Sequence, residues 1–193
     1  MAKKELSKAQ PVSETIADQP VSIPLDPSTA KIRVELGFVF SSDKGSSTLK
    51  SKIEEVRDNI YATFGINIPP VVVVDNAKLS FPKYRIMINN KEVANGEIGN
   101  LLGNSLVLAV DTGSATVYPY AKEATYFESG TKAWWISPSQ ENVALSYGYT
   151  VMNNPSVIAN HLKKAIIENM PEIVKCGETI VSSEGVLMVH SEV

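Results

Sequence analysis

The sequence has few of the residues that metal and redox sites use. Its 193 residues contain one cysteine, Cys176, and two histidines, His161 and His190. A single cysteine excludes a disulfide framework and a Cys-x-x-Cys redox pair, and no zinc-binding spacing joins it to the histidines. We therefore expect no metal and no cofactor. This cysteine content fits a reducing cytosol.

Long apolar segments and an excess of basic charge are also missing. The longest apolar runs, such as residues 68–74 and 106–110, are much too short to cross a bilayer. No apolar stretch of signal-peptide length follows Met1. The net charge is -3 and the sequence pI is about 5.5, so no overall basic field favours nucleic acid as a partner. We expect a cytoplasmic chain that binds no nucleic acid.

The first half of the chain predicts a strand, a helix and further strands. Residues 1–30 lack periodicity and are rich in polar residues and proline, as in a flexible linker. Alternation from Ile32 to Phe40 predicts a strand, and Asp43-Lys44-Gly45 a turn after it. Spacings of three and four predict a helix over 47–64 that ends at Gly65. Its buried face is expected to consist of Leu49, Ile53, Val56, Ile60 and Phe64.

The next segments predict a hairpin and an insertion. Residues 71–74 form a β-branched strand, and 84–88 with 93–97 frame a turn at Asn89-Asn90-Lys91. The pattern then weakens over 98–130, with two expected strands at 106–110 and 116–120, as in an inserted subdomain.

Two helix starts follow the insertion. A strand at 134–136 leads into Ser137-Pro138-Ser139-Gln140, which combines an N-cap serine, a first-turn proline and a third-position glutamine. Gly148 is expected to end that helix, and Asn154-Pro155 to begin another. The apolar face of the second helix is expected to contain Ile158, Leu162, Ala165 and Ile166.

Together these elements predict a mixed α/β fold with α+β character: a strand-helix-strand-hairpin core, an inserted small β-rich subdomain and a C-terminal helix. The predicted division is a flexible linker at 1–30, a discontinuous core at 31–97 and 131–153, an insertion at 98–130, a helix that begins a truncated third subdomain at 154–179, and a tail at 180–193.

One string resembles a catalytic site. Asp111-Thr112-Gly113 follows an apolar strand, as in aspartic proteases. That chemistry needs two carboxylates that share one proton, and the chain has only one such string. A retropepsin-like homodimer would supply the second copy. The alternative interpretation is a buried strand that enters a turn, because Asp and Gly are common turn residues.

Other candidate residues favour packing or binding over catalysis. Gly96, Gly99 and Gly103 lack the strand-to-helix context and the lysine of a phosphate loop. His161 lies on the predicted apolar helix face, where a lone histidine is typically packed. Trp134 and Trp135 are adjacent in a strand, so they face opposite sides: one ring can fill the core while the other stays at the surface or under the insertion. That outward ring is a binding candidate.

Several short strings, in one order and at compatible spacings, resemble the cytosolic region of the type III export-gate family. They are Glu35-Leu36-Gly37, Ile68-Pro69-Pro70-Val71, Asp75-Asn76, Tyr84-Arg85-Ile86, Val93-Ala94-Asn95-Gly96-Glu97, Gly130 with Ala133, Trp135 and Ile136, Gly148-Tyr149-Thr150-Val151, and Pro155 to Leu162. The resemblance covers residues 24–179. Members of that family carry a membrane bundle before this region and two further cytosolic subdomains after it, and the third subdomain builds the ring. This chain is then expected to be a fragment, a split gene product or a free-standing relative, without ring assembly of its own.

The resemblance implies a non-enzymatic docking module for export substrates or their chaperones, in a flagellar or virulence system. It would work in the cytoplasm at the inner face of the inner membrane, with membrane contact only through a full-length relative. The family's aromatic and acidic docking positions fall on Ser129 and Tyr126 without a gap, or near Phe127 and Glu128 with one, and its threonine position falls on Asn160. Trp134 and Trp135 join them as aromatic candidates. No catalytic residue is expected. The alternatives are the aspartic protease and a partnerless remnant or free regulator that competes with a complete export gate.

Overall fold

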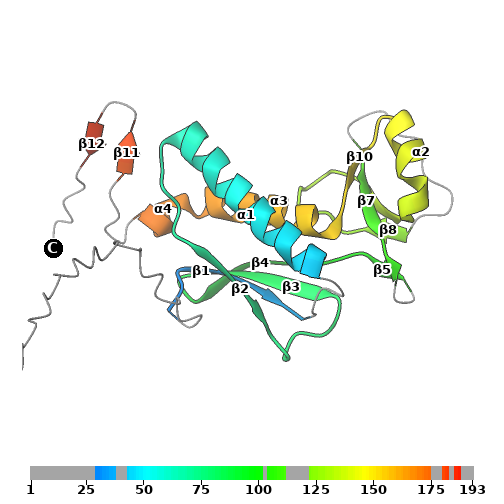
Figure 1. Cartoon of the computed structure of the whole chain (residues 1–193), viewed down its shortest axis with the longest axis horizontal. Coiled ribbons are helices and arrows are strands. Elements are labelled where there is room, and N and C mark those ends of the chain that lie inside the picture. Colours follow the sequence, from blue (N-terminus) through cyan, green and yellow to red (C-terminus); the bar gives the residue numbers. More distant parts are fainter. Residues whose placement is uncertain are drawn as a thin grey trace, which may run out of the picture.

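A computed structural model describes residues 29–37, 43–101, 104–111, 122–174, 180–182 and 185–187. Two four-stranded sheets organise it (Figure 1). The first sheet and its crossover helix come from β1 (Ile32–Leu36), α1 (Asp43–Phe64), β2 (Val71–Asp75), β3 (Lys83–Ile88) and β4 (Lys91–Glu97). These elements confirm the predicted strand-helix-strand-hairpin core.

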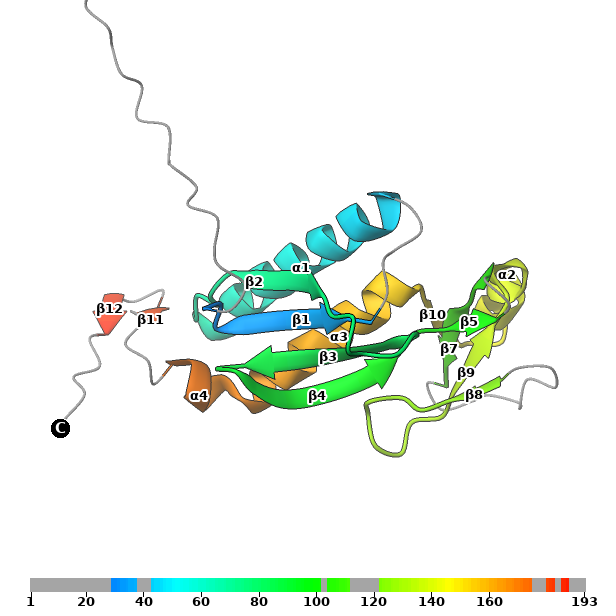
Figure 2. The ribbon, with the colours of Figure 1, turned by 90° about the horizontal axis from the view of Figure 1, so that it is seen from below.

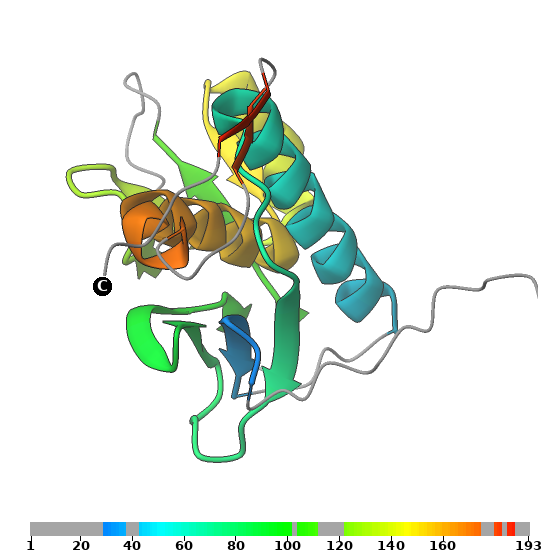
Figure 3. The same cartoon turned by 90° about the vertical axis from the view of Figure 1, so that its left-hand side faces the viewer.

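The first sheet has the strand order β2-β1-β3-β4. β1 and β2 pair in parallel through the α1 crossover, and β3 is antiparallel to both β1 and β4. Ile32, Val34 and Leu36 are buried, since alternate residues of β1 face the helices. Figure 3 shows α1 and the later helix α3 (Asn154–Glu168) on the same side of this sheet.

The helix α1 confirms most of the predicted face and corrects two details. Leu49, Ile53, Val56 and Ile60 are buried, but Phe64 is 48% exposed, so its assignment to the buried face was wrong. Figure 1 shows the last turn of α1 rising away from the strands of the first sheet. The turn predicted at residues 43–45 was also wrong: these residues begin α1, because short polar residues and glycine suit turns and helix starts alike.

The hairpin of β3 and β4 is confirmed. Asn89 and Asn90 both have positive φ, 48° and 63°, and form a two-residue turn between Ile88 and Lys91. Asparagine tolerates this backbone region better than most residues, which explains the turn at this position.

The second sheet has the order β10-β7-β9-β8. Its strands are β7 (Val107–Val110), β8 (Lys122–Ala124), β9 (Ala133–Ile136) and β10 (Thr150–Met152); a small ladder of β5 (Asn100–Leu101) and β6 (Asn104–Ser105) precedes them. The predicted strands at 106–110 and 134–136 are confirmed. The strand predicted at 116–120 lies outside the described residues.

Short helical turns connect β9 to β10. The 3-10 turn η1 (Pro138–Gln140) leads into α2 (Glu141–Ser146). The Ser137 N–H donates to Gln140 Oε1 at 3.2 Å, which confirms the predicted helix start. Gly148 follows with φ of 83°, as expected for a glycine after a helix.

The helix α3 returns from the second sheet to the first. Asn153 caps it by accepting a hydrogen bond from the Ser156 N–H at 3.0 Å, and Pro155 lies in its first turn, as predicted. Its apolar face joins the core between α1 and the sheet; the buried residues there include Ile158, Leu162, Ala165 and Ile166. The chain continues into α4 (Met170–Val174) and a separate ladder of β11 (Ile180–Ser182) and β12 (Gly185–Leu187).

The strand pairing differs from the division into core and insertion that the sequence predicts. That division grouped 131–153 with 31–97, whereas β9 and β10 both pair with β7 in the second sheet (Figure 2). Local periodicity identifies a strand but not its partner, which explains the difference. The helix predicted to begin a third subdomain packs into the core of the first sheet. Strand pairing alone does not define domain boundaries, which remain a prediction.

The mixed α/β class is confirmed by two sheets with helices over them. Among the described residues, none of the helices has the length and apolar character needed to span a membrane.

Candidate functional site

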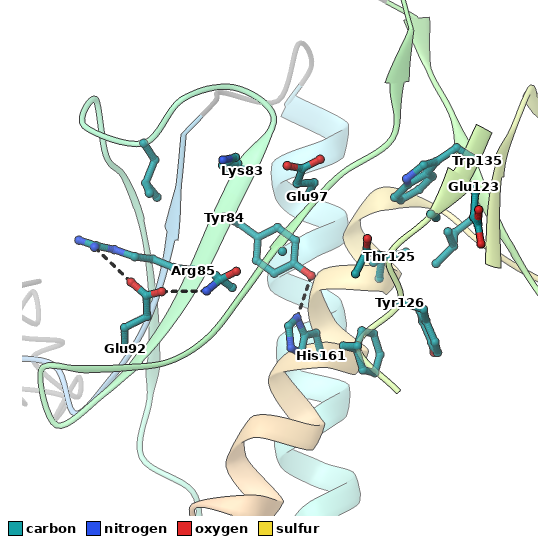
Figure 4. Close-up of a pocket in the computed structure, with 17 residues that line it drawn as sticks. Lys83, Tyr84, Arg85, Glu92, Glu97, Glu123, Thr125, Tyr126, Trp135 and His161 are labelled. Carbon is teal, nitrogen blue, oxygen red and sulfur yellow. Dashed lines mark hydrogen bonds and ion pairs between the residues drawn. The ribbon is translucent and has the colours of Figure 1, made fainter. Parts of the chain in front are cut away.

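A pocket of about 570 Å³ lies where the first sheet meets the second (Figure 4). Strands β3 and β4 border it on one side, residues 123–127 on the other, and β9 and α3 close its inner end. Its aromatic lining consists of Tyr84, Tyr126, Phe127, Trp135 and His161.

Three aromatic rings of the pocket form a row in which each contacts the next. The ring centroids of Tyr126 and Phe127 are 4.2 Å apart, and Phe127 stacks on His161 at 4.6 Å with an interplanar angle of 5°. Tyr126 and Phe127 are only partly buried, so each keeps surface that a ligand can cover. Trp135 is 8% exposed and packs in the core of the second sheet.

His161 and Tyr84 form a buried polar pair under this surface. Tyr84 Oη lies 2.9 Å from His161 Nδ1. Burial lowers the pKa of His161 to about 4, with Lys164 adding to the decrease and Glu168 opposing it. Burial also raises the pKa of the Tyr84 hydroxyl. Both groups are therefore neutral at pH 7, as required for a tyrosine O–H that donates to an imidazole nitrogen. The interpretation of His161 as a packed residue is confirmed.

Two glycines, one in β4 and one directly after it, let the backbone approach the rings of Tyr84 and Trp135. A Cβ at Gly96 would lie 2.6 Å from Tyr84 Oη, and one at Gly99 would lie 2.2 Å from a Trp135 ring carbon. Both separations are far inside van der Waals contact, so a side chain at either position would displace a buried aromatic ring. These glycines are explained by packing.

The charges beside the pocket are partly neutralised within the first sheet. Arg85 pairs with Glu35 at 2.8 Å and with Glu92 at 3.4 Å. Burial raises the pKa of Glu35, but hydrogen bonds from Asn76 and Arg85 outweigh it, so the net shift is downward. Glu97 and Glu123 also border the pocket, and neither forms an ion pair with any residue that the structure describes.

The structure brings three of the predicted site residues together: Tyr126, Phe127 and Trp135 all line the pocket. Glu128 is exposed beside it, and its charge adds to the effect of burial, which raises the pKa of Tyr126 to about 12. Asn160 is exposed in a different hollow between α1 and α3, where its Nδ2 lies 3.0 Å from Met152 Sδ. Binding by these residues remains a prediction.

The tryptophans occupy opposite faces of β9, as predicted, but neither ring is outward. Trp134 is 6% exposed and makes an edge-to-face contact with Tyr149 at 5.8 Å. The alternative of a ring at the surface is wrong, because α2 and its flanking residues cover the face of the second sheet opposite Trp135. Trp134 therefore does not border the pocket.

Sequence reasoning missed Tyr84, Glu97 and Glu123 as pocket residues. Each lies on a different strand, β3, β4 or β8, so no local motif joins them. The one available signal was Gly96 in a strand, which often marks a close approach of backbone to a ring or ligand.

Asp111 lies directly after β7, and its backbone N–H donates to Lys132 O at 2.9 Å. This position matches the interpretation of a strand end. Thr112 and Gly113 of the protease-like string lie outside the described residues.

Comparisons with known proteins identify the family. Residues 1–186 match the FHIPEP family. The flagellar biosynthesis protein FlhA of Borreliella burgdorferi is 32% identical over 178 residues, which cover 89% of this chain and 25% of that protein. FlhA of Caulobacter vibrioides is 27% identical over 165 residues, covering 83% of this chain and 23% of that protein. The chain thus spans about a quarter of the length of these relatives.

A similar fold occurs in the solved complex of Chlamydia pneumoniae CdsV and CdsO, with a TM-score of 0.60 and 21% identity over 75% of this chain and 46% of that chain. The family match and the FlhA relatives confirm the resemblance to export-gate proteins. The chain belongs to the FHIPEP family and is similar to flagellar biosynthesis proteins.

Proposed function

We propose that the chain is a non-enzymatic docking module for export substrates or their chaperones in a flagellar or virulence-associated type III system. The observation that carries this proposal is the pocket at the junction of the two sheets, with Tyr126 and Phe127 partly exposed on its rim. Docking would take place on the cytoplasmic side of the inner membrane, where a full-length relative supplies the membrane contact.

Protein interfaces draw most of their affinity from a few aromatic anchors in concave sites. Tyr126 and Phe127 form such a pair, and Trp135 and His161 hold the inner end of the pocket rigid by packing and hydrogen bonding. A partner side chain that enters here covers ring surface without first ordering the site. Preorganisation of this kind reduces the entropic cost of binding.

The polar groups of the pocket support binding over catalysis. His161 and Tyr84 are bonded to each other and buried, so neither is poised as an acid or base toward the pocket. CdsV, whose fold is similar, forms a complex with CdsO, and this supports proteins as partners for the fold.

The test fills the pocket without removing a contact. Thr125 is exposed and lines the pocket, so Thr125→Trp should block entry while the melting temperature stays that of the parent. Asn142→Trp, at an exposed position on α2, is the matched control. Isothermal titration with a cognate chaperone-substrate complex should show affinity lost in the first variant and kept in the second. Parental affinity in both would refute docking at this pocket.

A further inference from the structure

We propose that the edge of β4 that pairs with none of the described strands binds an extended segment of the partner by strand addition, and that this segment carries basic side chains toward Glu97 and Glu123. The inference rests on the proposed docking function and specifies how the partner is held.

The first argument is the direction of the backbone groups of β4. β4 is the last strand of its sheet and pairs only with β3 among the described strands. The Ile98 N–H donates to Pro82 O at 3.1 Å. Hydrogen-bonded pairs alternate along an antiparallel ladder, so Gly96 and Ala94 face β3. The backbone groups of Asn95 and Glu97 consequently point away from the sheet.

The second argument is that this edge opens onto the pocket. Asn95, Gly96 and Glu97 line it from one side and residues 123–127 from the other. A strand added about 4.8 Å from β4 would lie in this space. Unpaired edges of this kind are templates for another chain, and proteins use them to bind extended peptides.

The third argument is charge. Lys83 lies opposite Glu97 in the ladder, and the two form no ion pair in the described part of the chain. Arg85 is held by Glu35 and Glu92. If the charge of Lys83 offsets that of Glu97, the carboxylate of Glu123 gives the pocket a net negative charge. Figure 4 shows the carboxylates of Glu97 and Glu123 among the side chains of the pocket. A partner segment with lysine or arginine complements this negative charge.

The fourth argument concerns the pattern of the segment. Side chains alternate across a strand, and Glu97 lies on the face of β4 opposite Gly96 and the Tyr84 ring. Side chains of the added strand on the same face as Gly96 would contact the aromatic surface around Phe127. The side chains that alternate with them would contact the carboxylates of Glu97 and Glu123. The partner segment should therefore alternate apolar and basic residues.

The test compares a variant that lacks the outward N–H of residue 95 with a control variant that keeps this N–H. Asn95→Pro lacks this donor, whereas Asn95→Ala loses only the side chain, including its 3.0 Å hydrogen bond to Glu92. The probe is a short fluorescein-labelled peptide of alternating valine and lysine, titrated against the full chain by fluorescence anisotropy. Asn95→Pro should weaken binding about tenfold relative to Asn95→Ala. Equal affinity in the two variants would overturn strand addition.

A charge reversal tests the same site independently. Glu97→Lys with Glu123→Lys should weaken the valine-lysine probe and strengthen a valine-glutamate probe. If Asn95→Pro loses its fold in a thermal melt, this double variant decides: a reversed probe preference supports the proposal and an unchanged one overturns it. A parent dimer in sedimentation that is lost in Asn95→Pro would mean that a second copy occupies the edge, which also overturns it.

The outcome separates this inference from the docking proposal. If Thr125→Trp abolishes binding of the chaperone-substrate complex while Asn95→Pro binds it like Asn95→Ala, docking stands and strand addition is wrong. If Thr125→Trp also leaves binding intact, both proposals fail.

Discussion

Phe127 and His161 lie face to face, with ring centroids 4.6 Å apart and planes that differ by 5°. The same histidine bonds Tyr84 of β3, so one residue of α3 joins the segment after β8 to the first sheet. Phe127 consequently has two separable roles. It borders the pocket, and it holds residues 123–127 against α3.

Phe127→Ala should weaken binding of a cognate chaperone-substrate complex at least about tenfold, because truncating an aromatic anchor typically costs 2 kcal/mol or more. Stability should change less, since the ring is only partly buried. Isothermal titration and thermal melts on the same variant separate the two effects. Tyr147→Ala removes an exposed aromatic outside the pocket, 59% accessible, and is the control. A lower melting temperature with unchanged affinity would leave Phe127 with a packing role only.

His161 should make the chain less stable in acid. Its pKa is about 4 in the folded state, against an ordinary value of 6.5. Between these values the unfolded chain binds the extra proton, so the free energy of unfolding falls as the pH drops from about 6.5 to about 4. The contribution is on the order of 3 kcal/mol.

Urea denaturation of the parent and of His161→Gln at pH 7 and pH 4.5 measures this term. The variant should lose less stability on acidification than the parent. Equal losses in both proteins would mean that His161 titrates at its ordinary value.

Ile53→Ala tests the core between α1 and the first sheet. The side chain is 2% exposed in the main apolar cluster. Lost transfer energy and the remaining cavity should together reduce the free energy of unfolding by about 2 to 5 kcal/mol. Tyr61→Ala, on the exposed side of the same helix, should change it far less. A loss below about 0.5 kcal/mol for Ile53→Ala would contradict the assigned packing.

Asp111→Asn should leave fold and partner binding intact, because Asp111 ends a strand and its backbone N–H is bonded to Lys132 O. Incubation of the parent and the variant with an unfolded substrate at acidic and neutral pH checks this expectation. Pepstatin-sensitive cleavage by the parent that disappears in the variant would establish the aspartic-protease alternative.

Much of the fold could be predicted because its signals are local. The alternation in β1, the spacing from Leu49 to Ile60, and the asparagine turn each depend on a few neighbouring residues. The partner of β9 could not be predicted in this way, because a strand pattern is the same in either sheet. The exposure of Phe64 was missed for a related reason: periodicity gives the side of a helix but not where its cover ends.

The candidate site was only partly predictable. Tyr126 and Phe127 came from the family resemblance. Glu97 and Glu123 could not be linked, because they lie on strands of different sheets. Asn160 follows the family's docking position, yet it lies in a separate hollow from the aromatic pocket.

Hydrogen-deuterium exchange of the full chain, with and without a bound chaperone-substrate complex, tests docking at the junction pocket most directly. Docking predicts slower exchange across residues 123–127, and strand addition predicts it also at the backbone amides of β4, above all Asn95 and Glu97. Unchanged exchange across residues 123–127, with protection on another apolar surface such as Val143, Leu145 and Tyr147 around α2, would contradict docking at this pocket.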